Sequence, residues 1–125
     1  MDISALVLIL FSVSVTAGAQ LLLKQGAMVS SGGGEWVALS TADRLIALLG
    51  QPYIIAGLSL YGIGAVIWLF ALSRVDLSLA YPFVGLGFVL IMVLSHYLLG
   101  EQLATLRILG TVMIAVGCVL VARSA

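Results

Sequence analysis

Every charged residue of this chain lies outside four long apolar stretches, which cover residues 3–23, 52–73, 77–99 and 108–122. The first three have roughly 20 residues or more, and at about 1.5 Å per residue such a helix crosses a hydrocarbon core of about 30 Å. A charge at mid-membrane costs at least about 2.5 kcal/mol, so this segregation identifies lipid as the solvent of the four stretches. The pattern predicts a four-span integral membrane protein.

The lipid environment also restricts the secondary structure of the spans. Each segment must pair its own backbone groups, and these stretches are too long and continuous for barrel strands. We therefore expect an all-α protein, a single domain over residues 1–125. The connections at 74–76 and 100–105 are short, which predicts antiparallel neighbours in an up-down-up-down bundle. Lysines and arginines are divided almost evenly between the two ends, so they predict no orientation.

Composition excludes several classes of function. Only 8% of the residues are charged and the net charge is zero, which argues against a nucleic-acid partner. Cys118 is the single cysteine and has no metal-ligand spacing around it, so no metal or cofactor is expected. No nucleophile or acid–base pair suggests an enzyme.

The first span has a second interpretation as a signal peptide. Residues 17–19 read Ala-Gly-Ala, like a small-residue cleavage site after an apolar run. However, no Lys or Arg precedes this run, and three leucines continue it past the site. We therefore expect the first span to be retained.

The one long connection, residues 24–51, joins the first two spans. Its Ser-Ser-Gly-Gly-Gly stretch at 30–34 predicts a flexible linker. After it, Ser40 offers a helix cap, and apolar residues from Ala42 to Leu49 follow helical spacing up to Gly50. This pattern predicts a short amphipathic helix in the membrane interface, and a lid over a cavity mouth fits it equally well.

Polar side chains recur every four residues in the first span, at Ser12, Thr16, Gln20 and Lys24. On a helix they form one stripe. The two hydroxyls could line a cavity or could hydrogen-bond a neighbouring helix. A buried amide needs partners, because an unsatisfied one costs a few kcal/mol in an apolar medium. Gln20, with Lys24 one turn beyond it, therefore favours a cavity.

The third span contains a proline beside a tyrosine, at Tyr81-Pro82, followed by Gly85 and Gly87. Proline kinks a helix, and glycines allow another backbone or a ligand to come close. The helix face that contains Tyr81 is more often used for packing than for a site, whereas discontinuous helices are typical of transporter binding regions, so both interpretations stay open.

Three further features concern the ends of the spans and their packing. Tyr53, Tyr61 and Trp68 have the character of membrane-interface anchors. Glu101 is either a solvated loop carboxylate or a group with a structural or headgroup-binding role. In the fourth span Gly110 and Gly117 are seven residues apart, which is a spacing suited to packing against another helix or a second copy of the chain.

Taken together, these residues resemble the four-span members of the drug/metabolite transporter superfamily, which includes the small multidrug resistance and EamA-like proteins. The resemblance is carried by Gly18-Ala19-Gln20, Trp68-Leu69-x-x-Leu72, Leu79-Ala80-Tyr81-Pro82, Phe88-Val89, Gly100-Glu101, Gly110 and Gly117. The pattern is closer to the paired subunits that flip aminoarabinose-phosphoundecaprenol in bacterial inner membranes than to the small multidrug resistance exporters.

The resemblance implies a multi-pass inner-membrane transporter subunit that flips a polyprenyl-phosphate-linked aminosugar or a similar amphiphilic lipid, as a homodimer or with a similar four-span chain. The implied substrate-binding residues are Thr16, Gln20, Lys24, Trp68, Tyr81 and Glu101. The alternative is an exporter of small cations or metabolites. Those exporters carry a glutamate where this chain has Thr16, and a neutral hydroxyl cannot exchange a proton for a cation. A scaffold that stabilises a partner is a third possibility.

Overall fold

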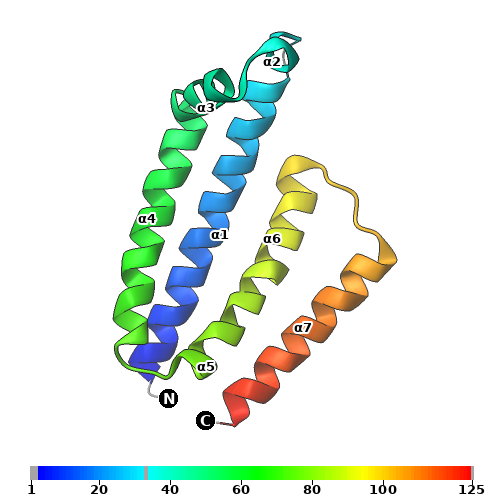
Figure 1. The fold of residues 1–125 in the computed structure, drawn as a ribbon. Coiled ribbons are helices and arrows are strands. Elements are labelled where there is room, and N and C mark those ends of the chain that lie inside the picture. The colour runs from blue at the N-terminus through cyan, green and yellow to red at the C-terminus, as the bar shows by residue number, and fades with distance from the viewer. Residues whose placement is uncertain (1–2, 33, 125) are drawn as a thin grey trace.

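The computed structural model describes residues 3–32 and 34–124, and these contain helices but no strand. The helices are α1 (Ile3–Ser31), α2 (Glu35–Ala38), α3 (Thr41–Leu49), α4 (Pro52–Leu72), α5 (Leu77–Ala80), the 3-10 turn η1 (Tyr81–Phe83), α6 (Val84–Leu99) and α7 (Thr105–Arg123). Four helical segments are long and apolar enough to cross a membrane, the third being the continuous α5–η1–α6 segment. This confirms the predicted all-α, four-span class. Successive long helices run in opposite directions (Figure 1).

The first helix is longer than the apolar stretch that predicted it. α1 continues beyond Lys24 to Ser31, whose hydroxyl donates to the carbonyl of Ala27 at 2.7 Å in the last turn. The apolar stretch ends at Lys24, but the backbone hydrogen bonds of the helix continue beyond it, because lysine is a good helix former. Ser30 and Ser31 therefore belong to the helix rather than to the predicted linker, and position 33 lies outside the described residues.

Small residues form the contact between α1 and α4. Buried positions recur every seven residues, at Ala5, Ser12, Ala19 and Gly26 in α1 and at Gly57, Gly64 and Ala71 in α4. A seven-residue repeat keeps contacts on one face of each helix, and small side chains let two membrane helices approach closely. We call these seven positions the small-residue seam. Across it, the Ser12 hydroxyl donates to the Gly64 carbonyl at 2.7 Å.

The third span changes from α-helix to a 3-10 turn and back where it reaches the core. Pro82 lies in η1, between α5 and α6, and its carbonyl accepts a hydrogen bond from the Cys118 thiol of α7. A Cβ atom at Gly85 would lie 2.6 Å from Cγ2 of Ile114 in α7, and one at Gly87 would lie 3.2 Å from Cγ1 of Val13 in α1. Both glycines thus let α6 pack closely between these two helices.

The fourth span is the least covered of the four. α7 packs against α6 and η1, and Thr111 and Cys118 are its only buried residues. A Cβ atom at Gly110 or Gly117 would meet nothing within 4 Å among the described residues. Among residues 3–32 and 34–124, the space that a side chain would occupy is therefore open at both glycines, and their role in a dimer remains a prediction.

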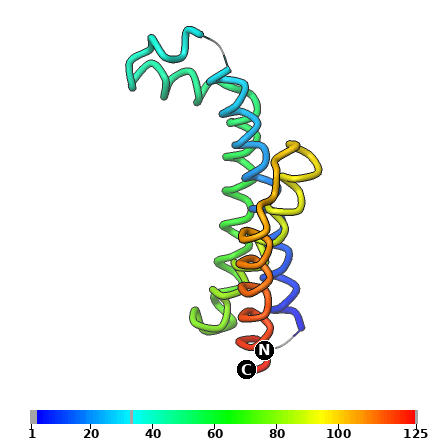
Figure 2. The backbone as a smooth tube through the Cα atoms, turned by 90° about the vertical axis from the view of Figure 1, so that its right-hand side faces the viewer, coloured from blue at the N-terminus to red at the C-terminus, as the bar shows by residue number. Residues whose placement is uncertain are grey.

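The connection between α1 and α4 is ordered by one arginine. Arg44 of α3 donates from Nε to the Trp36 carbonyl at 3.1 Å and from Nη2 to the Val37 carbonyl at 3.0 Å, and its guanidinium lies over the Trp36 ring. Ser40 caps α3 by accepting from the Asp43 N–H, as its sequence predicted. Figure 2 shows α2 and α3 extending sideways from the end of the α1–α4 pair. A location in the membrane interface remains a prediction.

Candidate binding cavity

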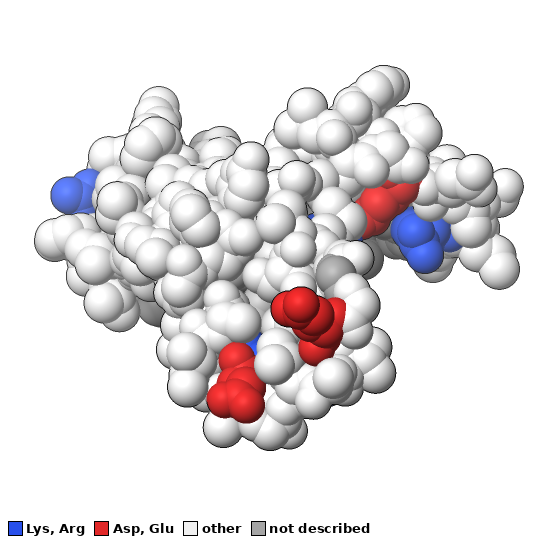
Figure 3. Space-filling model, turned by 90° about the horizontal axis from the view of Figure 1, so that it is seen from above, with Lys and Arg blue, Asp and Glu red and all other residues white. Residues whose placement is uncertain are grey.

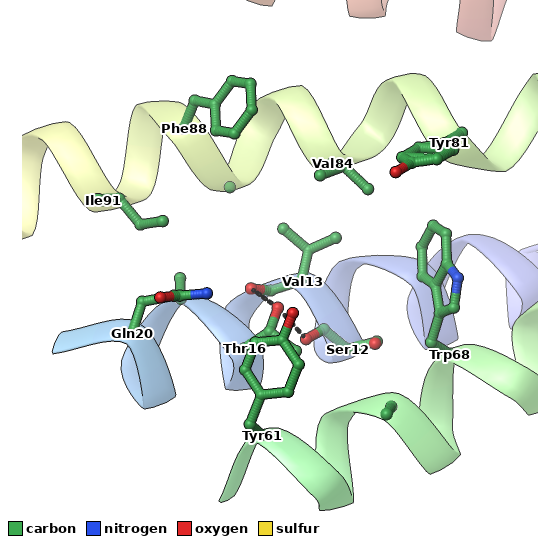
Figure 4. A pocket seen from close by; sticks show the side chains of 13 residues that line it. Ser12, Val13, Thr16, Gln20, Tyr61, Trp68, Tyr81, Val84, Phe88 and Ile91 are labelled. Carbon is green, nitrogen blue, oxygen red and sulfur yellow. Dashed lines mark hydrogen bonds between the residues drawn. The ribbon is translucent and has the colours of Figure 1, made fainter. Parts of the chain in front are cut away.

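A cavity of about 330 Å³ lies between α1, α4 and the third span (Figure 4). Each of the three segments contributes side chains with different chemistry. The lining residues are Ser12, Val13, Thr16, Ala17 and Gln20 of α1, Tyr61, Ala65 and Trp68 of α4, Tyr81 of η1, and Val84, Gly87, Phe88 and Ile91 of α6.

The α1 wall contains the polar stripe that the sequence indicated. Ser12 is buried and its hydroxyl is used in the small-residue seam, so it serves helix packing. The Thr16 hydroxyl donates within α1, to the Ser12 and Val13 carbonyls at 3.1 and 3.0 Å, which leaves its oxygen as an acceptor. The Gln20 amide makes no hydrogen bond within residues 3–32 and 34–124 and lies in the cavity opposite Ile91. Gln20 is thus the one side chain of this wall with both donor and acceptor capacity unused.

Aromatic rings form the opposite end of the cavity. Trp68 and Tyr81 meet edge to face, with ring centroids 6.5 Å apart and an interplanar angle of 71°. Figure 4 shows the Tyr81 ring standing over Trp68, with Tyr61 further along the α4 wall toward Gln20. Tyr81 belongs to the η1 turn, which precedes the start of α6 at Val84, so the turn rather than α6 places this ring beside Trp68. The rings offer apolar faces together with phenol and indole hydrogen-bonding groups.

Among the described residues that line this cavity, there is no Asp, Glu, Lys, Arg or His side chain. Lys24 is exposed on the same stripe, four residues beyond Gln20 and thus about 6 Å further along α1. Glu101 lies in a different groove, which shares Phe88 and Ile91 with the cavity. The structure therefore brings Thr16, Gln20, Trp68 and Tyr81 together and leaves Lys24 and Glu101 outside.

Some lining residues had no clear signal in the sequence. Tyr61 has the character of an interface anchor, yet it lines the cavity with Ala65 and Trp68. These three follow i, i+4, i+7 spacing, so the face of α4 that contains Trp68 could have identified them. Val84 and Ile91 are aliphatic residues in an apolar helix, and nothing in their type separates a cavity wall from a lipid-facing surface.

The cavity is suited to the uncharged, hydrogen-bonding part of a ligand next to an apolar part. Pockets of this size are mostly apolar, with a few polar groups that fix orientation. Here a free amide at one end and hydroxyl and indole groups at the other can hydrogen-bond a group such as a sugar, while the aromatic faces cover its carbon atoms. The described lining has no charge that would compensate an ammonium or a phosphate, so the charged groups of a ligand would have to be compensated outside the cavity.

The sequence matches the EamA-like transporter family over residues 3–123. It is 34% identical over 120 residues to the probable 4-amino-4-deoxy-L-arabinose-phosphoundecaprenol flippase subunit ArnE of Aeromonas hydrophila, covering 96% of each chain. It is 32% identical over 103 residues to the protein of that name from Pectobacterium atrosepticum, covering 82% of this chain and 84% of the relative. It is 33% identical over 85 residues to the one from Pseudomonas savastanoi pv. phaseolicola, covering 68% and 75%.

No solved structure matches this chain. The family match confirms the resemblance that the sequence motifs carried, and it covers almost the whole chain. Four helices of spanning length and bacterial relatives of this class make the protein a multi-pass protein of the bacterial inner membrane. The chain belongs to the EamA-like transporter family.

Proposed function

We propose that this chain is a non-enzymatic subunit of a flippase that moves a polyprenyl-phosphate-linked aminosugar across the inner membrane. The observation that carries the proposal is the uncharged cavity in which the free Gln20 amide faces an aromatic end formed by Trp68 and Tyr81. The relatives named as flippase subunits for such a lipid support the same substrate class.

In this proposal the sugar passes through the cavity while the polyprenyl tail stays in the bilayer. Gln20 and Tyr81 supply neutral hydrogen bonds to the sugar, and Thr16 supplies an acceptor. Lys24, one turn beyond Gln20, attracts the phosphate near the membrane surface. Because the cavity wall has no carboxylate, transport follows the substrate gradient or is driven by a partner.

A second four-span chain would complete the transport path. The word subunit in the names of the relatives supports an assembly of more than one chain. In the described part of the chain, the Cβ positions of Gly110 and Gly117 of α7 are open, and small residues of this kind let membrane helices approach. We propose that this face of α7 contacts the second chain, which is either another copy or a similar protein.

Replacing Gln20 with alanine, or Tyr81 with phenylalanine, is expected to slow flipping about 3- to 10-fold, because each change removes one neutral hydrogen bond to the sugar. The measurement uses proteoliposomes that contain the aminosugar lipid, with its amine labelled from outside to report the leaflet in which it lies. If flipping requires a partner, the partner chain is reconstituted with every variant.

Matched controls are Gln25→Ala and Tyr97→Phe, which change the same residue types at positions that do not line the cavity. Both controls should flip the lipid at the wild-type rate. If folded Gln20→Ala and Tyr81→Phe proteins also did so, the cavity would not be the path of the sugar.

A further inference from the structure

A second groove, of about 380 Å³, lies where α6 ends and α7 begins, and it contains one acidic and one basic side chain. Glu101 and Arg107 both line it, together with Ser95, Thr111, Leu103, Met92, Phe88 and Ile91. Seen from above, the molecule shows few charged side chains, and on the right of the view an acidic and a basic side chain lie next to each other (Figure 3). Since Phe88 and Ile91 also line the binding cavity, the two sites are neighbours.

The backbone of Glu101 is held at several points. Gly100 ends α6 in the left-handed region, with φ of 71°, so that its N–H and that of Glu101 both donate to the Ser95 carbonyl. This arrangement is a common way to close a helix, and it favours glycine strongly at that position. His96 Nδ1 then donates to the Glu101 carbonyl at 2.8 Å. The carboxylate is therefore presented from an ordered turn rather than from a loose loop.

Both charged groups keep binding capacity for a ligand. The Glu101 side chain is half-buried, and its carboxylate has no hydrogen bond or ion pair within the part of the chain that the structure describes. The Arg107 guanidinium donates once, from Nη1 to the Gln102 carbonyl at 3.2 Å, which leaves its other N–H groups available. A partly buried carboxylate without a partner gains from a cation, and free guanidinium donors match a phosphate.

We propose that this groove binds a lipid headgroup that carries both a phosphate and an ammonium, with Arg107 on the phosphate and Glu101 on the ammonium. The inference rests on the proposed function and assigns the groove as the site where the headgroup is held before or after it passes the cavity. A headgroup with both charges satisfies both side chains at once, whereas a purely anionic headgroup would face the unpaired carboxylate.

The test measures equilibrium binding to the protein in nanodiscs of phosphatidylglycerol, which has no amine. The two probes are aminoarabinose-phosphoundecaprenol and its N-acetylated form, which has the same tail and phosphate but no ammonium. Wild-type protein should bind the lipid with the free amine about tenfold more tightly than the N-acetylated lipid. A hydrogen bond between charged groups contributes a free energy that corresponds to about a tenfold change in affinity. Glu101→Gln should lose this preference, and Arg107→Gln should weaken the binding of both probes.

Glu35→Gln and Arg123→Gln are the matched controls, because these residues lie outside the groove, and both should behave as wild type. The wild-type comparison of the two probes needs no variant, so it stands even if a substitution impairs folding. Equal binding of the two probes to wild-type protein would overturn the inference. So would an undiminished preference for the amine in folded Glu101→Gln protein.

The source of the headgroup is decided by adding phosphatidylethanolamine, which also carries a phosphate and an ammonium. If phosphatidylethanolamine displaces the aminosugar lipid from wild-type protein but not from Glu101→Gln protein, the groove is a site for the bulk lipid. If phosphatidylethanolamine displaces none of it, the aminosugar lipid is the ligand of the groove. A different result would refute the proposed function without refuting the headgroup site. Wild-type protein that shows the Glu101-dependent preference but flips no lipid would refute the flippase and retain the groove.

Discussion

Replacing Gly64 with leucine is expected to separate α1 from α4 and to lower the free energy of unfolding by about 3 kcal/mol, the upper end of the usual range for overpacking. Even a Cβ atom at this position would lie 2.6 Å from Cγ2 of Thr16. Thr16 cannot easily turn away, because its hydroxyl is bonded to the Ser12 and Val13 carbonyls. Moving the helices apart would also break the bond from Ser12 to the Gly64 carbonyl.

The matched control is Gly62→Leu, two residues away on the same helix. A Cβ atom at Gly62 meets nothing within 4 Å in the described structure, and leucine has a higher helix propensity than glycine. The control should therefore unfold at the same temperature as wild type or slightly above it. The unfolding temperature of both variants is measured in detergent, with the loss of monodisperse protein on heating as the signal. Equal unfolding temperatures for the two variants would show that the small-residue seam does not hold the helices together.

The substitution Ala65→Trp is expected to reduce flipping more than tenfold and to leave the fold intact. Ala65 is exposed in the single chain and lines the binding cavity, so an indole there would occupy much of the 330 Å³ between Gln20 and Trp68. The expected loss is larger than that for Gln20→Ala, because it excludes the sugar rather than removing one hydrogen bond. Proteoliposome flipping and thermal unfolding are measured on the same preparation.

Ala56→Trp provides the comparison for this change. Ala56 is also exposed and also lies on α4, but it does not line the cavity. A tryptophan there should leave flipping close to the wild-type rate. If both tryptophan variants flipped the lipid normally, or if both lost activity to the same degree, occupation of the cavity would not explain the effect.

The sequence was sufficient to predict the spans because lipid imposes a simple rule on charge. The second and third spans begin at the residues where hydropathy placed them, and Pro52 occupies the first turn of α4 as proline prefers. The end of α1 could not be predicted in this way. Hydropathy reports the solvent of a segment, whereas α1 continues past Lys24 because its hydrogen bonds and the contact of Gly26 with Ile54 persist outside the apolar stretch.

The sequence also indicated part of the cavity but not its walls. Gln20 and Tyr81 stood out because an amide and a proline-linked tyrosine are unusual in an apolar span, and both line the cavity. Its aliphatic wall did not stand out, because valine and isoleucine suit lipid equally well. The sequence also directed attention to Gly110 and Gly117, whereas the described contacts use a seven-residue repeat in α1 and α4. The seven-residue spacing of small residues does not by itself show whether they pack within one chain, as in the small-residue seam, or face outward, as Gly110 and Gly117 do in the described structure.

In the proposed mechanism, a lipid headgroup crosses the membrane through a cavity whose described lining has no charged group. The most direct measurement compares two activities of the wild-type protein in proteoliposomes, with any partner chain that it requires: flipping of the aminosugar lipid, and uptake of a quaternary ammonium cation driven by a pH gradient. We expect the lipid to reach the opposite leaflet, and the quaternary cation not to be taken up when the pH gradient is applied. Gradient-driven cation uptake without lipid flipping would contradict the proposed mechanism.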